Sequence, residues 1–381
     1  MEDFGLRDAI EIENRKFIVH TGTLLEQGKI ISEIFEEGMF LISREYNIQL
    51  RREGKVQNYE FLAQMTNEFH ERIISELDAL YRIRTKLKRF KHPKSNYYLG
   101  VLFLRRNLYE EAIEQFRTAI ALDKNYIRAY VGLGISYLKA RKFRNALEVF
   151  QKALIKNEKY PDVLNYLGLT YLFMGDYDHA TTLFKNAIQL NPEYVEAQFN
   201  LGVALYKSAL EGVKDPRAVA VPARVFIYLK QVRAQEKYRT PEWEKECNEL
   251  LELLKDNNHE IIIPQLERFQ LKLVEMLAEK EKIYEFYLRF LYGGRVLDLK
   301  TIEHYEPYFL DETKRRERYP DYWNDLGTYN LIRSRGLYMK AIAEFEKAIE
   351  MQPDFREARE ILEKVKSNEK GFIILLRAIL K

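Results

Sequence analysis

Apolar positions recur every 34 residues through the middle of the chain. Five positions keep this register, and they are Leu99, Leu133, Leu167 and Leu201; Gly100, Gly134, Gly168 and Gly202; Ala112, Ala146 and Ala180; Phe116, Phe150 and Phe184; and Ala119, Ala153 and Ala187. In each unit, two segments with a helical period of apolar residues flank a short polar break such as MGDYDHA. The pattern predicts a tandem array of helical hairpins over residues 93 to 207.

The order of residue types within a unit resembles the tetratricopeptide repeat family: Leu-Gly, then Ala, Phe and Ala, with a late Pro as in LNPEY. The resemblance implies a mainly α fold, in which hairpins stack into a right-handed α-solenoid and their first helices line a concave groove. Small residues such as Gly168 and Ala180 are expected where two helices approach closely. These consensus residues are therefore expected to form the scaffold and not to bind a partner.

The 34-residue phase is lost in the fourth unit and returns near the end of the chain, with two extra residues between its halves. The returning positions are Trp323, Leu326, Gly327, Ala341, Phe345, Ala348 and Pro353. We expect three full hairpins and the start of a fourth over 93–212, and a last hairpin with a capping helix over 319–368. The helical segment between them, 213–318, either continues the superhelix as divergent hairpins, which we favour, or forms a separate layer that covers it.

The two ends of the chain differ from the repeats. Residues 1–50 contain short β-branched and aromatic runs separated by Gly-containing turns, which predicts an antiparallel β module of roughly four strands. A module of this kind precedes the repeats in some bacterial tetratricopeptide proteins. So small a sheet is expected to dock on the connecting and capping helix over 51–92 or to pair with another chain. The apolar tail, 369–381, could be a capping helix, a dimer contact, a membrane-surface anchor or an internal ligand for the groove.

Composition narrows the functional class. The 61 basic and 58 acidic residues give a net charge of +3, which is too balanced for the whole-molecule field that draws proteins onto nucleic acid or anionic lipid. The single cysteine, Cys247, cannot form an internal disulfide. No run approaches the ~18 to 20 apolar residues of a transmembrane helix, and the acidic start carries no export signal. We therefore expect a cytoplasmic protein without a transmembrane segment.

Motifs for catalysis are absent from the sequence. Gly28-Lys29 and Gly54-Lys55 lack the spacing of a phosphate-binding loop. The six histidines never fall at the spacing of metal ligands, and the adjacent His70 and Glu71 point apart on a helix. We expect no catalytic residue, cofactor or metal, and no enzyme activity. An enzyme with its site in 213–318 has no positive support.

One run of basic residues stands out, at the end of the helix expected over 51–92. Its members are Arg82, Arg84, Lys86, Lys88, Arg89, Lys91 and Lys94. The run is the best candidate in the sequence for RNA or a membrane surface, yet basic residues are also favoured at helix C-termini by the macrodipole. Nucleic acid is therefore an unlikely partner.

The family geometry places the candidate binding surface on the inner side of the first helices. The residues at the corresponding positions are Tyr97, Tyr98, Val101, Leu104 and Arg105; Arg128, Val131, Ile135, Leu138 and Lys139; Asn165, Tyr166, Leu169, Leu172 and Phe173; and Phe199, Asn200, Val203, Tyr206 and Lys207. One position reads Tyr98, Gly132, Tyr166 and Asn200, which departs from the repeated asparagines that hold extended peptides in some family members. This apolar and aromatic wall better fits an amphipathic helix. Alternatively, the protein's own helices cover it.

These observations lead to a functional hypothesis. We expect a non-catalytic scaffold or adaptor that binds a helical or peptide segment of a partner in the groove, with possible self-association through the β module or the C-terminal tail. The alternative is a regulatory or assembly subunit of a multiprotein machine such as a pilus, secretion or motility apparatus.

Overall fold

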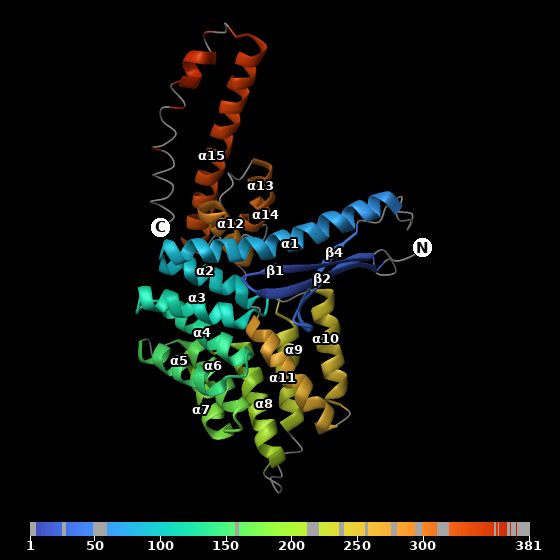
Figure 1. Ribbon diagram of the computed structural model, residues 1–381. Helices are drawn as coiled ribbons and strands as arrows, with labels where there is room; N and C mark the ends of the chain where they lie inside the picture. Colours follow the sequence, from blue (N-terminus) through green and yellow to red (C-terminus); the bar gives the residue numbers. More distant parts are fainter. Residues whose placement is uncertain are drawn as a thin grey trace. The chain divides into compact units, whose positions relative to one another are not determined.

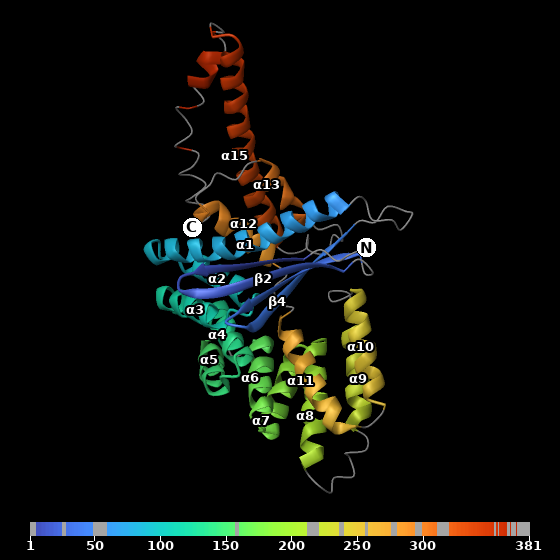
Figure 2. The same ribbon diagram turned by 45° about the vertical axis from the view of Figure 1, so that its right-hand side comes forward.

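The computed structural model describes residues 5–24, 28–48, 59–156, 160–211, 221–235, 240–255, 258–275, 280–293, 299–310, 320–353 and 358–363, together with residues 356, 366 and 371. The chain divides into two compact units, whose elements are drawn in Figures 1 and 2. Unit 1 comprises residues 1–102 and 280–381, and unit 2 comprises residues 103–279. No helix over the described residues combines the length and the apolar character needed to cross a membrane.

Unit 1 begins with a four-stranded antiparallel sheet in the order β1-β2-β3-β4, which confirms the predicted β module. The strands are β1 (Gly5–Ile12), β2 (Arg15–Leu24), β3 (Lys29–Glu36) and β4 (Met39–Asn47). Two-residue turns join β1 to β2 and β3 to β4, and each turn residue has a positive φ: 50° and 67° at Glu13 and Asn14, and 48° and 84° at Glu37 and Gly38. Such turns match the right-handed twist of paired strands.

The sheet buries one face against α1 (Tyr59–Arg89), and both lie in unit 1. Alternate residues of the strands face the helix, so Phe17, Val19 and Ile30 are fully buried while their neighbours are not. A buried polar contact also joins the sheet to the helix, because the Thr21 hydroxyl of β2 lies 2.7 Å from Nδ1 of His70 in α1. The sheet therefore docks on the helix that follows it, the first of the two arrangements expected for it.

The rest of unit 1 packs around an aromatic cluster. Its helices are α12 (Glu281–Tyr292), α13 (Leu299–His304), α14 (Glu306–Phe309) and α15 (Pro320–Met351). Phe286 at the centre of the cluster lies between the rings of Tyr305, Phe309 and Tyr329, with centroids 5.1 to 5.8 Å apart. The N-terminal half of α15 contributes Tyr329 and Ile332 to this core.

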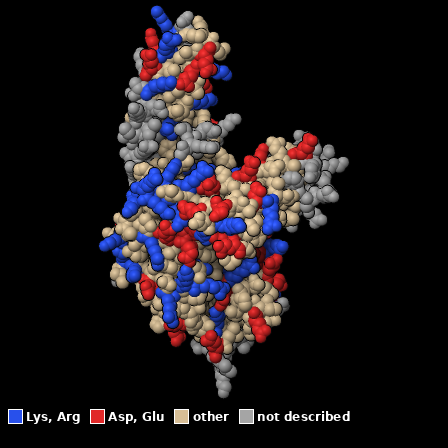
Figure 3. Space-filling view, in the orientation of Figure 1, with Lys and Arg blue, Asp and Glu red and all other residues tan. Residues whose placement is uncertain are grey.

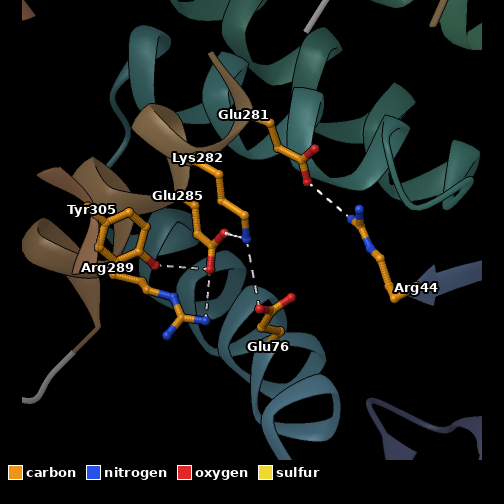
Figure 4. Close-up of polar contacts among 7 residues, drawn as sticks. All are labelled: Arg44, Glu76, Glu281, Lys282, Glu285, Arg289 and Tyr305. Atoms are coloured by element: carbon orange, nitrogen blue, oxygen red, sulfur yellow. Dashed lines mark hydrogen bonds and ion pairs between the residues drawn. The ribbon is translucent and has the colours of Figure 1, made fainter. Parts of the chain in front are cut away.

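A buried polar network ties these elements to α1 (Figure 4). The Glu285 side chain, 4% exposed, accepts hydrogen bonds or ion pairs from Lys282 at 2.8 Å, Arg289 at 2.9 Å and the Tyr305 hydroxyl at 3.2 Å. Burial and the Glu285 carboxylate raise the pKa of Tyr305, so its hydroxyl stays a donor. Lys282 also lies 3.9 Å from Glu76 of α1. Each charge in the network therefore has an opposite charge nearby, as a buried carboxylate requires.

The C-terminal hairpin expected within 319–368 is not what the structure has. A single helix, α15, runs through both expected helices and through the expected break between them. Nothing inside α15 ends it, because it contains neither a proline after its first residue nor a residue with positive φ. Gly336 remains helical and packs closely on α13, where an added Cβ would lie 2.9 Å from Cδ1 of Ile302. Apart from residue 371, the predicted apolar tail over 369–381 lies outside the described residues.

Unit 2 is a row of paired helices, which confirms the predicted α-solenoid of hairpins (Figure 1). Its helices are α3 (Tyr109–Leu122), α4 (Ile127–Lys139), α5 (Phe143–Lys156), α6 (Pro161–Phe173), α7 (Tyr177–Leu190), α8 (Val195–Glu211), α9 (Val221–Arg233), α10 (Pro241–Leu253) and α11 (His259–Glu275). The preceding helix, α2 (Pro93–Leu104), crosses the boundary between the units. Consecutive helices from α3 to α9 pack on each other.

The consensus residues explain this packing. In the α6–α7 hairpin the ring of Phe184 lies over Gly168, so a Cβ added to Gly168 would meet the ring at 2.7 Å. Phe184 and Ala180 are fully buried there. The turn before α7 requires a left-handed residue, supplied by Gly175 with a φ of 83°. Glycine, alanine and phenylalanine thus act as packing residues, as predicted.

The helices after the repeats keep part of this arrangement. α9 packs along α8 as the second helix of a hairpin, although it lacks the consensus alanine and phenylalanine. α10 begins at an N-cap, where the Thr240 side chain accepts a hydrogen bond from the Trp243 backbone N–H at 3.2 Å. α11 then returns to α8, and this contact decides what part of the concave groove stays open.

Candidate partner-binding cleft

The predicted groove residues of unit 2 lie on α4, α6 and α8, but most of them are buried within the unit. Leu138, Leu169, Leu172, Phe199 and Val203 are fully buried. Lys139, Phe173 and Lys207, which end the inner faces of their helices, are half-buried. Arg128 is exposed. The accessible part of the predicted wall therefore comprises Arg128 at the start of α4 and the residues at the C-terminal ends of the first helices.

α11 covers the inner wall of α8. The Phe269 ring lies 5.6 Å from Phe199 of α8 and stacks on Trp243 of α10 at 4.9 Å, and all three side chains are buried. Large aromatic side chains stabilise such contacts by about 1.5 to 3 kcal/mol each through burial. The expected partner position on α8 is occupied by a helix of the same chain.

Side-chain amides continue this contact along the groove. Gln270 of α11 donates to the Asn200 side chain at 2.9 Å, Asn200 donates to Asn165 of α6 at 2.9 Å, and Asn165 lies 3.3 Å from the Tyr194 hydroxyl. Gln270, Asn200 and Asn165 are at most 3% exposed, so satisfied hydrogen bonds are needed to keep them there. Of the two asparagines predicted to face a partner, Asn200 thus bonds to α11 directly, and Asn165 is held by Asn200 and Tyr194.

Polar contacts also hold the outer part of α11. Lys207 of α8 forms an ion pair with Glu267 at 2.5 Å, and the Tyr206 hydroxyl lies 2.5 Å from Nδ1 of His259. Together with the aromatic and amide contacts, these pairs show that the protein's own helix covers the α8 part of the groove, which was the alternative left open by the sequence.

In unit 1 the first-helix residues of α2 meet α12 in a similar way. Tyr98 stacks on Tyr284 with ring centroids 4.1 Å apart and lies 6.2 Å from Tyr287. Tyr97 meets Tyr284 edge-on at 6.1 Å, and Val101 is buried. These predicted groove residues are therefore engaged by α12.

An open cleft remains inside unit 2, between the repeat turns and the α10–α11 pair, with a volume of about 1010 Å³. It is lined by Asn107, Tyr109, Leu138, Lys139, Arg141, Phe143, Phe173, Glu242, Lys245, Glu246, Glu249, Pro264, Gln265, Glu267, Arg268, Leu271 and Lys272. Three of these, Leu138, Lys139 and Phe173, belong to the predicted groove. The others were missed by the sequence interpretation.

The repeat side of this cleft belongs to an aromatic ladder, defined by Tyr109, Phe143 and Tyr177, the first residues of α3, α5 and α7. Tyr109 and Phe143 line the cleft, and Tyr177 continues the ladder beyond its lining. The last inner residue of each following first helix packs on it. The Lys139 ammonium lies 5.8 Å above Tyr109, Phe173 stacks on Phe143 at 5.9 Å, and Lys207 lies 5.8 Å above Tyr177. Tyr109, Phe143 and Tyr177 are 34 residues apart, and this spacing could have identified the ladder from the sequence.

The charge of Lys139 is perturbed by its place in the cleft. Burial, together with the positive charge of Arg105, lowers the pKa of Lys139 to about 7. Burial also raises the pKa of the neighbouring Tyr109 to about 12, so its hydroxyl is neutral. Near neutral pH Lys139 is therefore only partly protonated, and its neighbours Tyr109, Leu138 and Phe173 in the cleft are aromatic or apolar.

The facing wall is charged. α10 presents Glu242, Glu246 and Glu249 to the cleft, and α11 presents Arg268 and Lys272. Lys272 forms an ion pair with Glu246. The cleft thus has one aromatic and one charged side, which matches the two faces of an amphipathic segment.

The predicted basic run lies on α1 and the start of α2, where Figure 3 shows Lys and Arg side chains mixed with Asp and Glu. Several of its members make contacts within unit 1. Arg84 pairs with Glu13 of the first hairpin turn at 2.7 Å, and Lys86 donates to the Tyr292 carbonyl at 2.6 Å. Arg82 pairs with Asp78 at 2.7 Å, and Lys94 lies 5.9 Å above the Tyr98 ring. Lys88, Arg89 and Lys91 are exposed.

Titratable groups do not gather into a metal site over the described residues, where no three His, Cys, Asp or Glu side chains are placed to share an ion. His70 is instead buried between Thr21 and Asp8, 2.7 and 3.2 Å away. Burial raises the pKa of the Cys247 thiol to about 12, so it is not a thiolate at neutral pH. His70 therefore contributes to the packing of the sheet on α1, and Cys247 is a buried, protonated thiol.

Comparison with known proteins agrees with this geometry. A TPR repeat model matches residues 95–140 and 171–208, and a tetratricopeptide repeat model matches residues 131–172. No curated protein matches the chain.

Several solved structures are similar to parts of the chain. MamA is 23% identical, with 43% of this chain and 94% of MamA aligned at a TM-score of 0.36. YrrB, titled a TPR protein with an unusual peptide-binding site, is 19% identical over 52% of this chain and 97% of its own, at a TM-score of 0.32. PilF of Pseudomonas aeruginosa is 19% identical over 61% of this chain and 94% of its own, at a TM-score of 0.34.

Together the two repeat models cover residues 95–208, which include the α4–α5 and α6–α7 hairpins, in which Phe150 and Phe184 pack over Gly134 and Gly168. Residues 95–208 are therefore tetratricopeptide repeats, and a four-stranded antiparallel sheet precedes them in the chain.

Proposed function

We propose that the protein is a non-catalytic scaffold, and that it binds an amphipathic segment of a partner protein in the cleft between the aromatic ladder and α10–α11. The observation that carries the proposal is the half-buried aromatic wall that α11 leaves uncovered. Phe143 and Phe173 stack on each other and border an open space of about 1010 Å³ instead of a closed core. Clefts of this kind, apolar on one side and polar on the other, are the usual form of binding sites.

The partner's chemistry follows from the two walls. Apolar side chains at one face of a helix, spaced i, i+3, i+4 and i+7, would pack on Phe143, Phe173 and Tyr109. The opposite face of that helix would carry charges of both signs, because Glu249, Arg268 and Lys245 line the facing wall. Burying three large side chains contributes about 1.5 to 3 kcal/mol each, and association and ordering costs reduce this to micromolar affinity.

Site-directed photo-crosslinking tests this function. A photoreactive amino acid replaces Phe173 in the cleft or, as a matched control, Ile155 on the exposed side of α5, where the side chain is 81% exposed. We expect one defined protein adduct from position 173 and none from position 155. The partner is identified by mass spectrometry and its segment is then titrated against the purified chain.

The introduction of a charge into the cleft completes the test. Phe143→Glu, which places a carboxylate on the aromatic wall, should weaken binding of the identified segment at least tenfold, while Ile155→Glu should leave it unchanged. Equal adducts at both positions, or full binding by Phe143→Glu, would contradict the proposal. A pilus, secretion or motility component as the adduct would support the more specific alternative, a subunit of such a machine.

A further inference from the structure

α15 carries the complete spacing of a repeat hairpin although it is one continuous helix. Gly336 precedes Phe345 by nine residues, as Gly175 precedes Phe184 in the α6–α7 hairpin. Gly175 has a φ of 83° and forms the turn of its hairpin, whereas Gly336 is helical. The residue type that permits the turn is therefore present in α15 at the turn position, but the turn is not made.

The opened helix leaves consensus positions without the neighbours that they have in unit 2. Among the described residues, a Cβ added to Gly327 of α15 would meet no atom within 4 Å, whereas one added to the equivalent Gly168 would meet the Phe184 ring at 2.7 Å. Trp323, on the same side of α15 as Gly327, is 56% exposed. Phe184 is fully buried, and its equivalent Phe345 is only half-buried. The two halves of α15 are thus shaped to pack on each other.

The two halves of one helix cannot meet. Gly327 and Phe345 are 18 residues apart, and a rise of 1.5 Å per residue separates them by about 27 Å along the axis. Phe345 can therefore reach Gly327 only from a second copy of the chain, or if α15 bends at Gly336.

We propose that a second copy of this chain covers the exposed face of α15, so that two α15 helices pair in antiparallel fashion and exchange their halves. Each copy places Phe345 over Gly327 of the other. In this register Trp323 lies opposite Ile349, and Leu331 lies opposite Ala341. The arrangement is two-fold symmetric, because the N-terminal half of each α15 packs on the C-terminal half of the other. The packing of a repeat hairpin is therefore formed twice. The partner at this surface is another molecule of the same protein.

Cross-linking at the equivalent of the Gly168–Phe184 contact tests the pairing. The variant Gly327→Cys/Phe345→Cys, in a Cys247→Ala background, is treated with a short bis-maleimide. We expect a covalent dimer. A cross-link within one chain would show that α15 bends into its own hairpin, and an absence of any cross-link would show that the face stays uncovered; either result overturns the proposal.

A matched pair controls for random collision. Gly327→Cys/Lys347→Cys moves the second thiol two residues along the helix and rotates it by about 200°, away from the proposed contact. Its dimer yield should be at least tenfold lower. An equal yield from the two pairs would overturn the register.

Light scattering on the unmodified chain gives a result that does not depend on a variant's folding. The chain should have the mass of two copies at micromolar concentration, and Phe345→Glu should have the mass of one, with an unchanged circular dichroism spectrum. A single-copy mass for the unmodified chain would overturn the exchange.

Discussion

The α6–α7 hairpin and α15 contain the same consensus residues, but only the hairpin uses them to build a core. Phe184 is fully buried over Gly168, while the equivalent Phe345 is half-buried and no described atom lies within 4 Å of a Cβ added to Gly327. Consensus residues therefore do not by themselves produce a hairpin. They produce one where a turn brings the two helices together, and in α15 the packing of Gly336 on Ile302 accompanies a continuous helix instead.

The largest difference between the two regions is expected for phenylalanine truncation. Phe184→Ala should lower the free energy of unfolding by about 3 to 5 kcal/mol, because it leaves a cavity in a closed core. Phe345→Ala should lower it by about 1 kcal/mol or less in the dilute chain, as is typical of a partly exposed site. Urea denaturation followed by circular dichroism measures both. Equal losses would show that α15 has a closed core of its own.

The second test concerns the polar contacts that hold the start of α15. Asp325 accepts an ion pair from Lys280 at 2.8 Å and a hydrogen bond from the Tyr287 hydroxyl at 3.2 Å. Asp325→Ala should destabilise unit 1 by about 1.5 to 3 kcal/mol, the range for hydrogen bonds to charged groups. Asp325→Asn, which keeps an acceptor for Tyr287, should recover part of this loss. If the alanine variant melts like the unmodified chain, the apolar cluster alone positions α15.

Alanine at the two glycines should change stability in opposite directions. Gly168→Ala should destabilise the chain by about 1 to 3 kcal/mol, since the new Cβ overlaps the Phe184 ring. Gly327→Ala should stabilise the dilute chain by about 0.5 to 1 kcal/mol, because alanine favours a helix and the added Cβ overlaps no atom of the described residues. Differential scanning calorimetry reads both variants. A loss at both glycines would mean that Gly327 is also covered.

A further test concerns the protonation of Lys139 in unit 2. Since the pKa of Lys139 is lowered to about 7, the folded chain binds fewer protons than the unfolded chain between about pH 7 and the ordinary lysine range. The free energy of unfolding should therefore rise with pH across this window. Below the window, the folded chain carries the full destabilisation that comes from burying the protonated lysine. NMR of methylated lysines should show one amine titrating near pH 7.

Arg105→Gln sharpens this titration. Removing the neighbouring positive charge should raise the Lys139 midpoint, whereas Lys142→Gln, which removes an exposed charge three residues from Lys139, should leave it nearly unchanged. A midpoint that does not move in Arg105→Gln would assign the whole shift to burial.

The repeats could be predicted from the sequence because their packing is local. Leu167, Gly168 and Phe184 belong to one hairpin, and the 34-residue spacing repeats the same contacts in each unit. The β module was predictable for the same reason, since its strands pair with their immediate neighbours. Periodicity thus identifies elements that contact the next element in the chain.

The candidate site was predicted only in part. Lys139 and Phe173, which were among the predicted groove residues, line the cleft, and the 34-residue spacing of Tyr109 and Phe143 could have identified the rest of its aromatic wall. The return of α11 onto α8 could not be predicted, because Phe269 meets a residue 70 positions away through a contact that no local pattern encodes. The prediction of a hairpin in α15 was wrong. Its consensus residues and their spacing match those of the repeats, but they do not determine whether the chain turns between the two halves.

The docking of α11 has a consequence for concentration. α11 is tethered to the wall that it covers, so its local concentration is fixed, whereas that of any competing helix varies with expression. A competitor for the α8 wall would show an apparent dissociation constant equal to its intrinsic value divided by the fraction of molecules with α11 displaced. The covered α8 wall would therefore need a higher concentration of competitor for half-saturation than the same wall would need without α11.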